Sequence, residues 1–262
     1  MAKRALQFIV PVVILILIWQ VTAVTVSLFR GVVFPTPWQT VLRLGALAGG
    51  DRLSGVLIYR HIADSLLRWI WGFGIAAAAG LAYGLAAGWW RPLEEATGPL
   101  LHLLQLVPGL AWIPVAILIF GIGETATVFM IAMTALTPIA ISVLNGVKRV
   151  DTTYVRAARM LGAGHRVVLL RVLLPGALPF LISGLRIGLG NGWRVLVAGE
   201  MIVGTGTGLG YSIIQARWTL DYASAFACLM VIVAIGLAVE HALFRPLERK
   251  TVERWALERD TA

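Results

Sequence analysis

Long apolar runs constrain this chain more than any other feature of its sequence. Six runs approach or exceed the ~20 largely apolar residues that a helix needs to cross a bilayer. Because lipid offers the backbone no hydrogen-bonding partners, runs of this length form helices. We therefore predict an all-α polytopic membrane protein with about six transmembrane helices. The runs are Leu6–Leu28, Ile62–Trp89, Pro99–Phe120, Thr125–Leu144, Ala177–Met201 and Tyr222–Phe244.

Composition agrees with this fold class and excludes others. Hydrophobic residues make up 59% of the 262 positions and charged residues 13%, which is about half the charge of a water-soluble domain. The mean hydropathy of +0.85 excludes a disordered chain. The single cysteine, Cys228, has no partner for an intrachain disulfide, so we interpret it as a small packed hydrophobe.

The net charge of +9 comes from 22 Lys and Arg against 13 Asp and Glu. No nucleic-acid-binding pattern accompanies this excess, so we exclude nucleic acid as a partner. If the N-terminus is cytoplasmic, 14 of the 22 basic residues lie on the inner side and six on the outer side. The positive-inside rule therefore predicts a chain embedded in the lipid bilayer with both termini in the cytoplasm.

The second run carries glycines at a spacing of four, at Gly72, Gly80, Gly84 and Gly88. Small residues at this spacing share one helix face and let another helix approach closely, so the stripe is expected to pack the bundle. Prolines interrupt the third and fourth runs, and each removes a backbone donor and can kink its helix. Both a static kink and the lining of a moving pathway remain open for Pro108, Pro114 and Pro138.

The basic connection between the fourth and fifth runs, 147–175, is patterned like a docking element. Asp151 can cap a short helix over 152–161, and Gly162 or Gly164 can end it in the left-handed conformation. We expect Tyr154, Ala158 and Leu161 to share a face of this helix, and a second amphipathic stretch to follow over 165–174. A helix lying in the lipid headgroups, with its arginines on anionic lipid, is an equal alternative.

The residues of this connection resemble the EAA loop of permease subunits in ATP-binding-cassette (ABC) importers. The resemblance assigns contact with a cytoplasmic ATPase to Arg156, Ala157, Ala158, Arg159, Leu161, Gly162, Leu174 and Pro175. One residue departs from the family pattern, because Arg156 stands where the motif has glutamate. We therefore expect an acidic group, or at least no basic group, opposite Arg156 in the groove of the cognate ATPase.

Further matches from about residue 35 onward are similar to the branch of this family that imports nitrate, sulfonates, taurine and bicarbonate. They include Pro35-Thr36-Pro37, 61–68, Phe120-Gly121-Ile122-Gly123-Glu124 and Gly208-Leu209-Gly210. The resemblance implies the type I ABC importer permease (MetI-like) fold in a bacterial inner membrane. It divides the chain into a first helix with an outer loop at 1–61, a transmembrane core at 62–244 and a cytoplasmic tail at 245–262.

The chain lacks the residues of an ATPase or a metalloenzyme. None of its three lysines follows a glycine, so no P-loop is possible. We therefore expect no cofactor in this chain, with ATP and magnesium held by a partner ATPase. The four histidines, His61, His102, His165 and His241, lack metal-ligand spacing, so no metal or catalytic site is predicted. The glycine-rich stretch 204–210 is interpreted as a flexible turn that shapes an outer gate.

The fifth run carries charge inside the membrane. Arg186, Trp193 and Glu200 are seven residues apart, so they drift only about 20° per step and share a stripe, while Arg194 lies to one side. Charges within a membrane usually face a bundle interior or water, which favours a translocation path for an anion. The residues predicted to line it are Arg186, Trp193, Arg194 and Glu200. Structural ion pairs, including one with Asp64, are the alternative. We expect Glu200 to lie close enough to the outer surface to be solvated.

The predicted function is the permease subunit of an ATP-driven, binding-protein-dependent importer for a small anion. As the resemblance implies, two copies would form the pore, two ATPases would bind the 152–162 helices and a solute-binding protein would act outside. An ion-coupled secondary carrier or channel without an ATPase is the rival, and a membrane scaffold is a third reading. The rival predicts inverted repeats or acidic residues at the midplane, which the sequence does not clearly contain.

Overall fold

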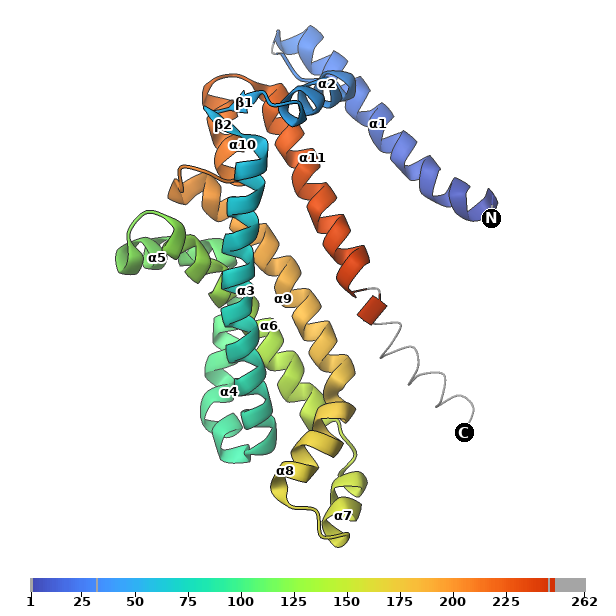
Figure 1. Cartoon of the computed structure of the whole chain (residues 1–262), viewed down its shortest axis with the longest axis vertical. Helices are drawn as coiled ribbons and strands as arrows, with labels where there is room; N and C mark the ends of the chain where they lie inside the picture. The colour runs from blue at the N-terminus through green and yellow to red at the C-terminus, as the bar shows by residue number, and fades with distance from the viewer. Residues whose placement is uncertain (1, 32, 245, 248–262) are drawn as a thin grey trace. The chain divides into compact units, whose positions relative to one another are not determined.

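A computed structural model of the chain describes residues 2–31, 33–244 and 246–247. Those residues divide into two compact units (Figure 1). Unit 1 combines Met1–Asp64 with Gly206–Ala234, and unit 2 combines Ser65–Thr205 with Ile235–Ala262. Helices dominate both units. Of the predicted cytoplasmic tail, 245–262, only 246–247 belong to the described residues, so that prediction lies outside them.

Five helices among the described residues are long and apolar enough to cross a membrane, and a bent helix pair is a candidate sixth. This confirms the predicted all-α membrane fold. The spanning segments include α1 (Ala2–Arg30), α3 (Ile58–Trp89), α6 (Glu124–Lys148), α9 (Leu174–Val203) and α11 (Tyr222–Val239). A π-helical turn, η3 (Glu240–Phe244), extends α11.

The third predicted span, Pro99–Phe120, is not one straight helix. It is divided into α4 (Arg91–Leu106), the 3-10 helix η1 (Gly109–Trp112) and α5 (Ile113–Phe120), with a bend of 102° between the two halves. Pro108 explains the break, because it lacks an N–H and forces the preceding residue into extended backbone. Pro114 lies in the first turn of α5, where a missing N–H costs nothing. Pro138 lies inside α6, which continues through it.

Unit 1 contains structure that the sequence analysis treated as a loop. Its residues 37–57 form α2 (Pro37–Ala48) and a hairpin of β1 (Arg52–Leu53) and β2 (Val56–Leu57), paired antiparallel. Thr36 caps α2, since its hydroxyl accepts from the Gln39 amide while the Gln39 side chain accepts from the Thr36 amide. This capping box, with proline after the cap, is a signal for a helix start that is present in the sequence itself.

The core of unit 1 joins α2 and the hairpin to α10 (Leu209–Trp218) and α11. Leu47, Ile58 and Cys228 are fully or almost fully buried there, which confirms Cys228 as a packed hydrophobe. Arg43 of α2 donates to Asp221 at 3.4 Å and to Ser224 at 2.8 Å. These bonds tie α2 to the start of α11.

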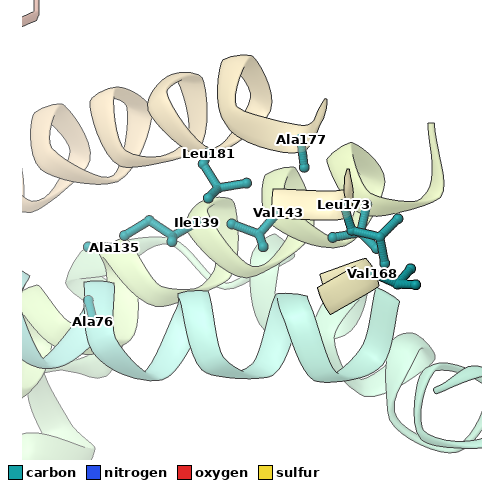
Figure 2. Packing of buried hydrophobic residues seen from close by; sticks show 9 residues of the cluster. Ala76, Ala135, Ile139, Val143, Val168, Leu173, Ala177 and Leu181 are labelled. Carbon is teal, nitrogen blue, oxygen red and sulfur yellow. The ribbon is translucent and has the colours of Figure 1, made fainter. Parts of the chain in front are cut away.

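Unit 2 is built around α6, which packs between α3 and α9 (Figure 2). The predicted glycine stripe of α3 makes this possible. A Cβ added to Gly84 would lie 2.6 Å from the Cβ of Val143, and one added to Gly80 would lie 2.9 Å from Ile139 Cγ2. On the other side, Gly188 of α9 approaches the Ile139 side chain equally closely. The stripe is therefore confirmed as a packing surface, because any larger residue would push the helices apart.

Candidate functional site

A cavity of about 480 Å³ opens in unit 2 where α4 and α5 are separated by the bend. Its wall comes from residues 104–110 at the break, from 133–138 of α6 and from 187–198 of α9. Gly109 brings the break against both helices, because an added Cβ would lie 2.4 Å from Val195 Cγ2 and 2.8 Å from Thr134 Oγ1. The break at Pro108 therefore forms a wall of the cavity.

The polar groups of this cavity suit an anion. Arg194 is exposed and donates from Nη1 to Asn191 Oδ1 at 3.1 Å. Within the described part of the chain Arg194 has no carboxylate partner. The Thr134 hydroxyl is buried beside the cavity and has no hydrogen-bonding partner among the described residues. The guanidinium of Arg194 on the cavity wall offers N–H donors to an oxyanion.

Two residues of the predicted stripe on α9, Arg186 and Trp193, contact neighbouring helices and not the cavity at Arg194. Arg186 forms an ion pair with Glu240 of η3. The Trp193 ring is buried against Trp69, with 4.6 Å between the ring centroids. These two side chains therefore bind neighbouring helices of unit 2. Arg194, which lies to one side of this stripe, is on the cavity wall.

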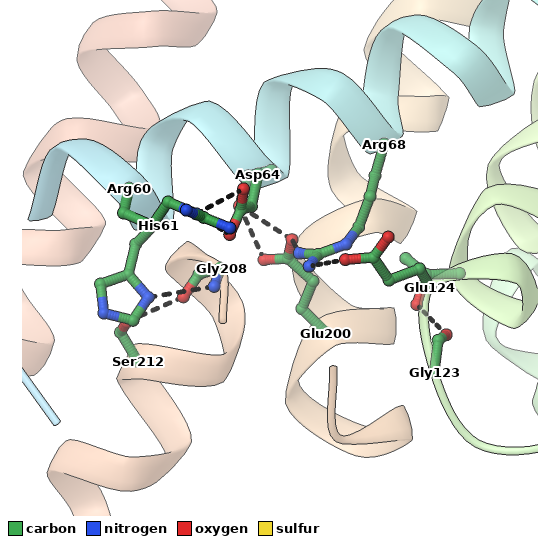
Figure 3. A network of polar contacts seen from close by, with 11 residues as sticks. Arg60, His61, Asp64, Arg68, Gly123, Glu124, Glu200, Gly208 and Ser212 are labelled. Atoms are coloured by element: carbon green, nitrogen blue, oxygen red, sulfur yellow. Dashed lines mark hydrogen bonds and ion pairs between the residues drawn. The ribbon is translucent and has the colours of Figure 1, made fainter. Parts of the chain in front are cut away.

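Glu200 is not solvated, so that expectation was wrong. Its side chain is 0% exposed and accepts from Arg68 at 2.7 Å and from the Ser65 hydroxyl at 2.8 Å (Figure 3). Arg68, 3% exposed, also donates to Glu124 at 2.9 Å, and Glu124 is 68% exposed. A buried carboxylate is stable only when it is paired. Arg68, the partner of Glu200 on α3, lies 132 residues away from it in the sequence. No local sequence pattern could therefore predict this pair.

The connection 147–175 forms α7 (Thr152–Met160), as predicted. Asp151 is its N-cap, with Oδ1 accepting from the Thr153 amide at 2.8 Å. This backbone hydrogen bond, a further one from the Thr153 side chain and the nearby charge of Arg156 hold the pKa of Asp151 below its ordinary value of 3.8. Gly162 has φ +79° and ends the turn, whereas Gly164 does not adopt a left-handed conformation.

The predicted face of α7 is divided in the structure. Ala158 packs inward together with Val155, whereas Tyr154 and Leu161 are 67% and 88% exposed. The outward surface therefore holds Tyr154, Leu161, Arg156 and Ala157. Exposed apolar groups next to an arginine suit a protein surface. The guanidinium of Arg159 turns back over the ring of Trp89, 6.0 Å from its centroid.

The second stretch, 165–174, is continuous with the fifth spanning segment. It consists of α8 (His165–Val168) and the π-helix η2 (Leu169–Leu173), which lead directly into α9. Leu174 and Pro175 are the first residues of α9, and the proline lies in the first turn. The connection therefore joins α9 as one continuous helical segment over His165–Val203.

His61 organises the glycine-rich stretch 204–210 from within unit 1. Its Nδ1 accepts from the Gly208 amide at 3.0 Å, and its Nε2 lies 3.1 Å from the Leu53 carbonyl. Both ring nitrogens are thus engaged by the backbone, and the histidine is buried. Three glycines of this stretch have positive φ, and α10 begins directly after Gly208. Among the described residues no cluster of three or more His, Cys, Asp or Glu could hold a metal.

Comparisons with known proteins agree with these features. Residues 72–252 match the family described as binding-protein-dependent transport system inner membrane component. The taurine transport system permease protein TauC of Escherichia coli is 37% identical over 237 residues, 90% of this chain and 85% of that protein. The putative aliphatic sulfonates transport permease protein SsuC of Bacillus subtilis is 35% identical over 240 residues, 92% of this chain and 84% of that protein.

Solved structures share the fold. A crystal structure of an amino acid ABC transporter aligns with a TM-score of 0.59 and 18% identity, over 84% of this chain and 100% of that chain. The MetNI methionine ABC transporter in an inward-facing conformation aligns with a TM-score of 0.56 and 21% identity, over 73% and 93% of the two chains. The predicted type I importer fold is therefore confirmed.

Proposed function

The chain belongs to the family of binding-protein-dependent transport system inner membrane components, and on this premise we propose that its cavity at Arg194 passes a small anion during ATP-driven import. Permeases of this family are non-catalytic subunits of ABC transporters. The relatives named for taurine, aliphatic sulfonates and bicarbonate suggest the same class of cargo. A sulfonate, taurine, nitrate or bicarbonate each presents oxygens to which a guanidinium can donate.

The observation that carries this proposal is the cation of Arg194 on the wall of a cavity between three helical segments of unit 2. Arg186 is paired with Glu240, and Glu200 with Arg68, so the charges of Arg186 and Glu200 are already compensated by these neighbours. Among the residues that the structure describes, Arg194 donates to the Asn191 oxygen alone, which leaves guanidinium N–H groups available. Intramembrane charges facing a cavity mark ion and substrate pathways.

We assign ATPase contact to the outward surface of α7, formed by Tyr154, Arg156, Ala157 and Leu161. Arg159, Gly162, Leu174 and Pro175 support this surface by ending α7 and beginning α9. A nearly apolar surface with one projecting cation suits a groove that has an acidic group opposite Arg156. A charge-swap pair tests this: Arg156→Glu should uncouple the native ATPase and recover with a basic residue in the groove. Unchanged coupling in Arg156→Glu alone would exclude the complementarity.

The proposed assembly has two copies of this chain, two ATPase subunits that hold ATP and magnesium, and an extracytoplasmic solute-binding protein. Both termini, the connection 147–175 and the tail 245–262 are then cytoplasmic in a bacterial inner membrane. Residues 1–61 supply a first helix and outer segment, and 62–244 the translocating core. Cycles of ATP binding would move α7 and thereby reorient the helices of the core, in alternating access.

Uptake into proteoliposomes tests the proposal. The chain is reconstituted with and without its genomically adjacent ATPase and binding protein, and uptake of taurine, ethanesulfonate, nitrate and bicarbonate is followed. We expect ATP-dependent uptake of at least one of these anions. Arg194→Gln should lower it roughly tenfold, because a charge-assisted hydrogen bond is lost, while Arg194→Lys should retain a larger part.

Two controls sharpen the test. Arg217→Gln removes a cation of the same type from α10, where it lies over the ring of Trp218, and should leave uptake unchanged. Uptake without the ATPase would support an ion-coupled carrier and exclude this proposal. Unchanged uptake by Arg194→Gln would exclude Arg194 from the path.

A further inference from the structure

The indole ring of Trp89 touches the connection 147–175 at two points. The guanidinium carbon of Arg159 lies 6.0 Å from the ring centroid. The His165 ring meets the same indole at 79°, with 5.8 Å between the centroids. Arg159 is at the end of α7 and His165 begins α8, so one side chain at the last residue of α3 contacts both sides of the turn between these helices.

The rest of α7 is weakly held. All nine residues of α7 belong to the described part of the chain, and none of them is buried. Val155 and Ala158 pack partly against the core of unit 2, in which Trp89 itself takes part. A short helix with so little burial depends on its few side-chain contacts for its position. The contacts with Trp89 are therefore a large share of what orients α7.

The backbone that carries Trp89 is fixed. A Cβ added to the preceding residue, Gly88, would lie 2.7 Å from the Cβ of Val147, so α3 and α6 are in direct contact there. The indole is thus presented by two closely packed helices to a short helix with no buried residues. Arginine stacks well on indole, because the negative face of the ring attracts its charge.

We propose that Trp89 is the positioning residue that joins α3 to α7, so that a displacement of α7 by the ATPase reaches α3 through the indole as well as reaching α6 and α9 along the chain. The inference rests on the proposed docking of an ATPase on α7. It adds a third route from the docking helix into the bundle. That route ends on the helix whose glycine stripe packs along α6.

Hydrogen exchange measures this directly on the full chain in lipid nanodiscs. In Trp89→Leu, the amides of 152–160 should exchange about two- to fivefold faster, the effect of losing an exposed cation–π contact. Arg159→Gln should have a smaller effect in the same direction, because it leaves the contact of Trp89 with His165 in place, and Arg159→Lys a smaller one still. The double variant Trp89→Leu/Arg159→Gln should be no worse than Trp89→Leu alone, since Trp89→Leu already removes the contact with Arg159. Trp89→Phe keeps an aromatic face and should lie between wild type and Trp89→Leu.

The matched control is Trp90→Leu. Trp90 is the next residue, has the same side chain and is 58% exposed, and its replacement should leave exchange at 152–160 unchanged. Equal effects of Trp89→Leu and Trp90→Leu, or additive effects of Trp89→Leu and Arg159→Gln, would overturn the inference.

The same variants are then measured with the ATPase bound. In wild type, binding should protect 152–160 and also 85–89 at the end of α3. In Trp89→Leu, protection at 152–160 should persist while the response at 85–89 is lost. Protection at 152–160 alone in wild type would overturn the route through Trp89. An ATPase that leaves 152–160 unprotected in wild type would overturn the proposed docking instead, and the variants of the chain alone would still decide how α7 is held.

Discussion

The two ends of the bundle formed by α3, α6 and α9 are held by different interactions. At one end, the buried pair of Arg68 and Glu200 joins α3 to α9, and Glu124 adds α6. At the other end, Trp89 and neighbouring apolar side chains hold the connection 147–175. The first end should therefore lose stability abruptly on substitution, and the second gradually. A charge left alone in a buried site is expensive, whereas apolar and aromatic contacts weaken in small steps.

The largest expected effect is at the charged end. Arg68→Met leaves the fully buried Glu200 without its cation, which should lower the free energy of unfolding by about 3–5 kcal/mol. Unfolding in detergent with increasing denaturant measures it. The double variant Arg68→Met/Glu200→Leu removes both charges and should recover most of the loss. A single variant as stable as the double one would contradict the contrast between the two ends.

The next largest loss of stability is expected from alanine substitutions in the glycine stripe of α3. Gly72 lies near the charged end of the bundle and Gly88 near the other end, so the two ends can be compared within one helix. A Cβ on Gly72 would lie 2.6 Å from Ile131 Cβ and 2.9 Å from the Val128 carbonyl oxygen, whereas the three atoms nearest to a Cβ on Gly88 all belong to the Val147 side chain. Overpacking costs about 1–3 kcal/mol. Gly72→Ala should be the more destabilising of the two, because a carbonyl cannot rotate away. Thermal unfolding of both variants checks the order, and the reverse order would contradict it.

A smaller effect is expected at the exposed edge of the charged end. Glu124 is mostly exposed, so its pairing with Arg68 is screened by solvent. Glu124→Gln should change the free energy of unfolding by less than about 1 kcal/mol, even though the Glu124 oxygen lies as close to Arg68 as a strong hydrogen bond requires. Denaturant unfolding of Glu124→Gln, measured in parallel with Arg68→Met, gives this change in free energy. A loss as large as that of Arg68→Met would show that Glu124 is not screened.

The smallest effect is expected at the cap of α7 and depends on pH. The pKa of Asp151 is lowered on folding, so its carboxylate stabilises α7 fully above the ordinary value of 3.8. This contribution is lost as the pH falls below 3.8 through the lowered pKa. Exchange of the 152–160 amides, corrected for the intrinsic pH dependence, should accelerate there. Asp151→Asn keeps an accepting oxygen without the titration, and a pH response as large in this variant would exclude Asp151 as its source.

Local patterns were sufficient for much of the fold and part of the site. The ends of α7 could be predicted from Asp151 and Gly162, because a helix cap and a left-handed glycine each act on residues only a few positions away. The glycines of α3 identified a packing face because helical spacing brings them together. The capping box at Thr36 is a local pattern of the same kind, and it predicts the start of α2.

Other features depend on partners far apart in the chain. Pro108 indicated a kink but not a bend of 102°, because the angle depends on what α4 and α5 pack against. Glu200 was expected in water, since nothing near it in the sequence indicates Arg68. On α9, the sequence placed Arg186, Arg194 and Glu200 along one path. It could not distinguish Arg194, which lies on a cavity wall, from the two charges that are paired with neighbouring helices.

The membrane class, the family and the short helix α7 depend on residues that are neighbours in sequence or one helical turn apart, so they could be predicted from the sequence alone. The rotation of α9 could not be predicted in this way. It follows from the pairing of the buried Glu200 with Arg68 on α3 and of the half-buried Arg186 with Glu240 on η3, and from glycines that let α6 come close. Once those contacts are made, Arg194 has the cavity as its surroundings. Burial of charge is a property of the assembled bundle, and that is why the tertiary contacts had to assign it.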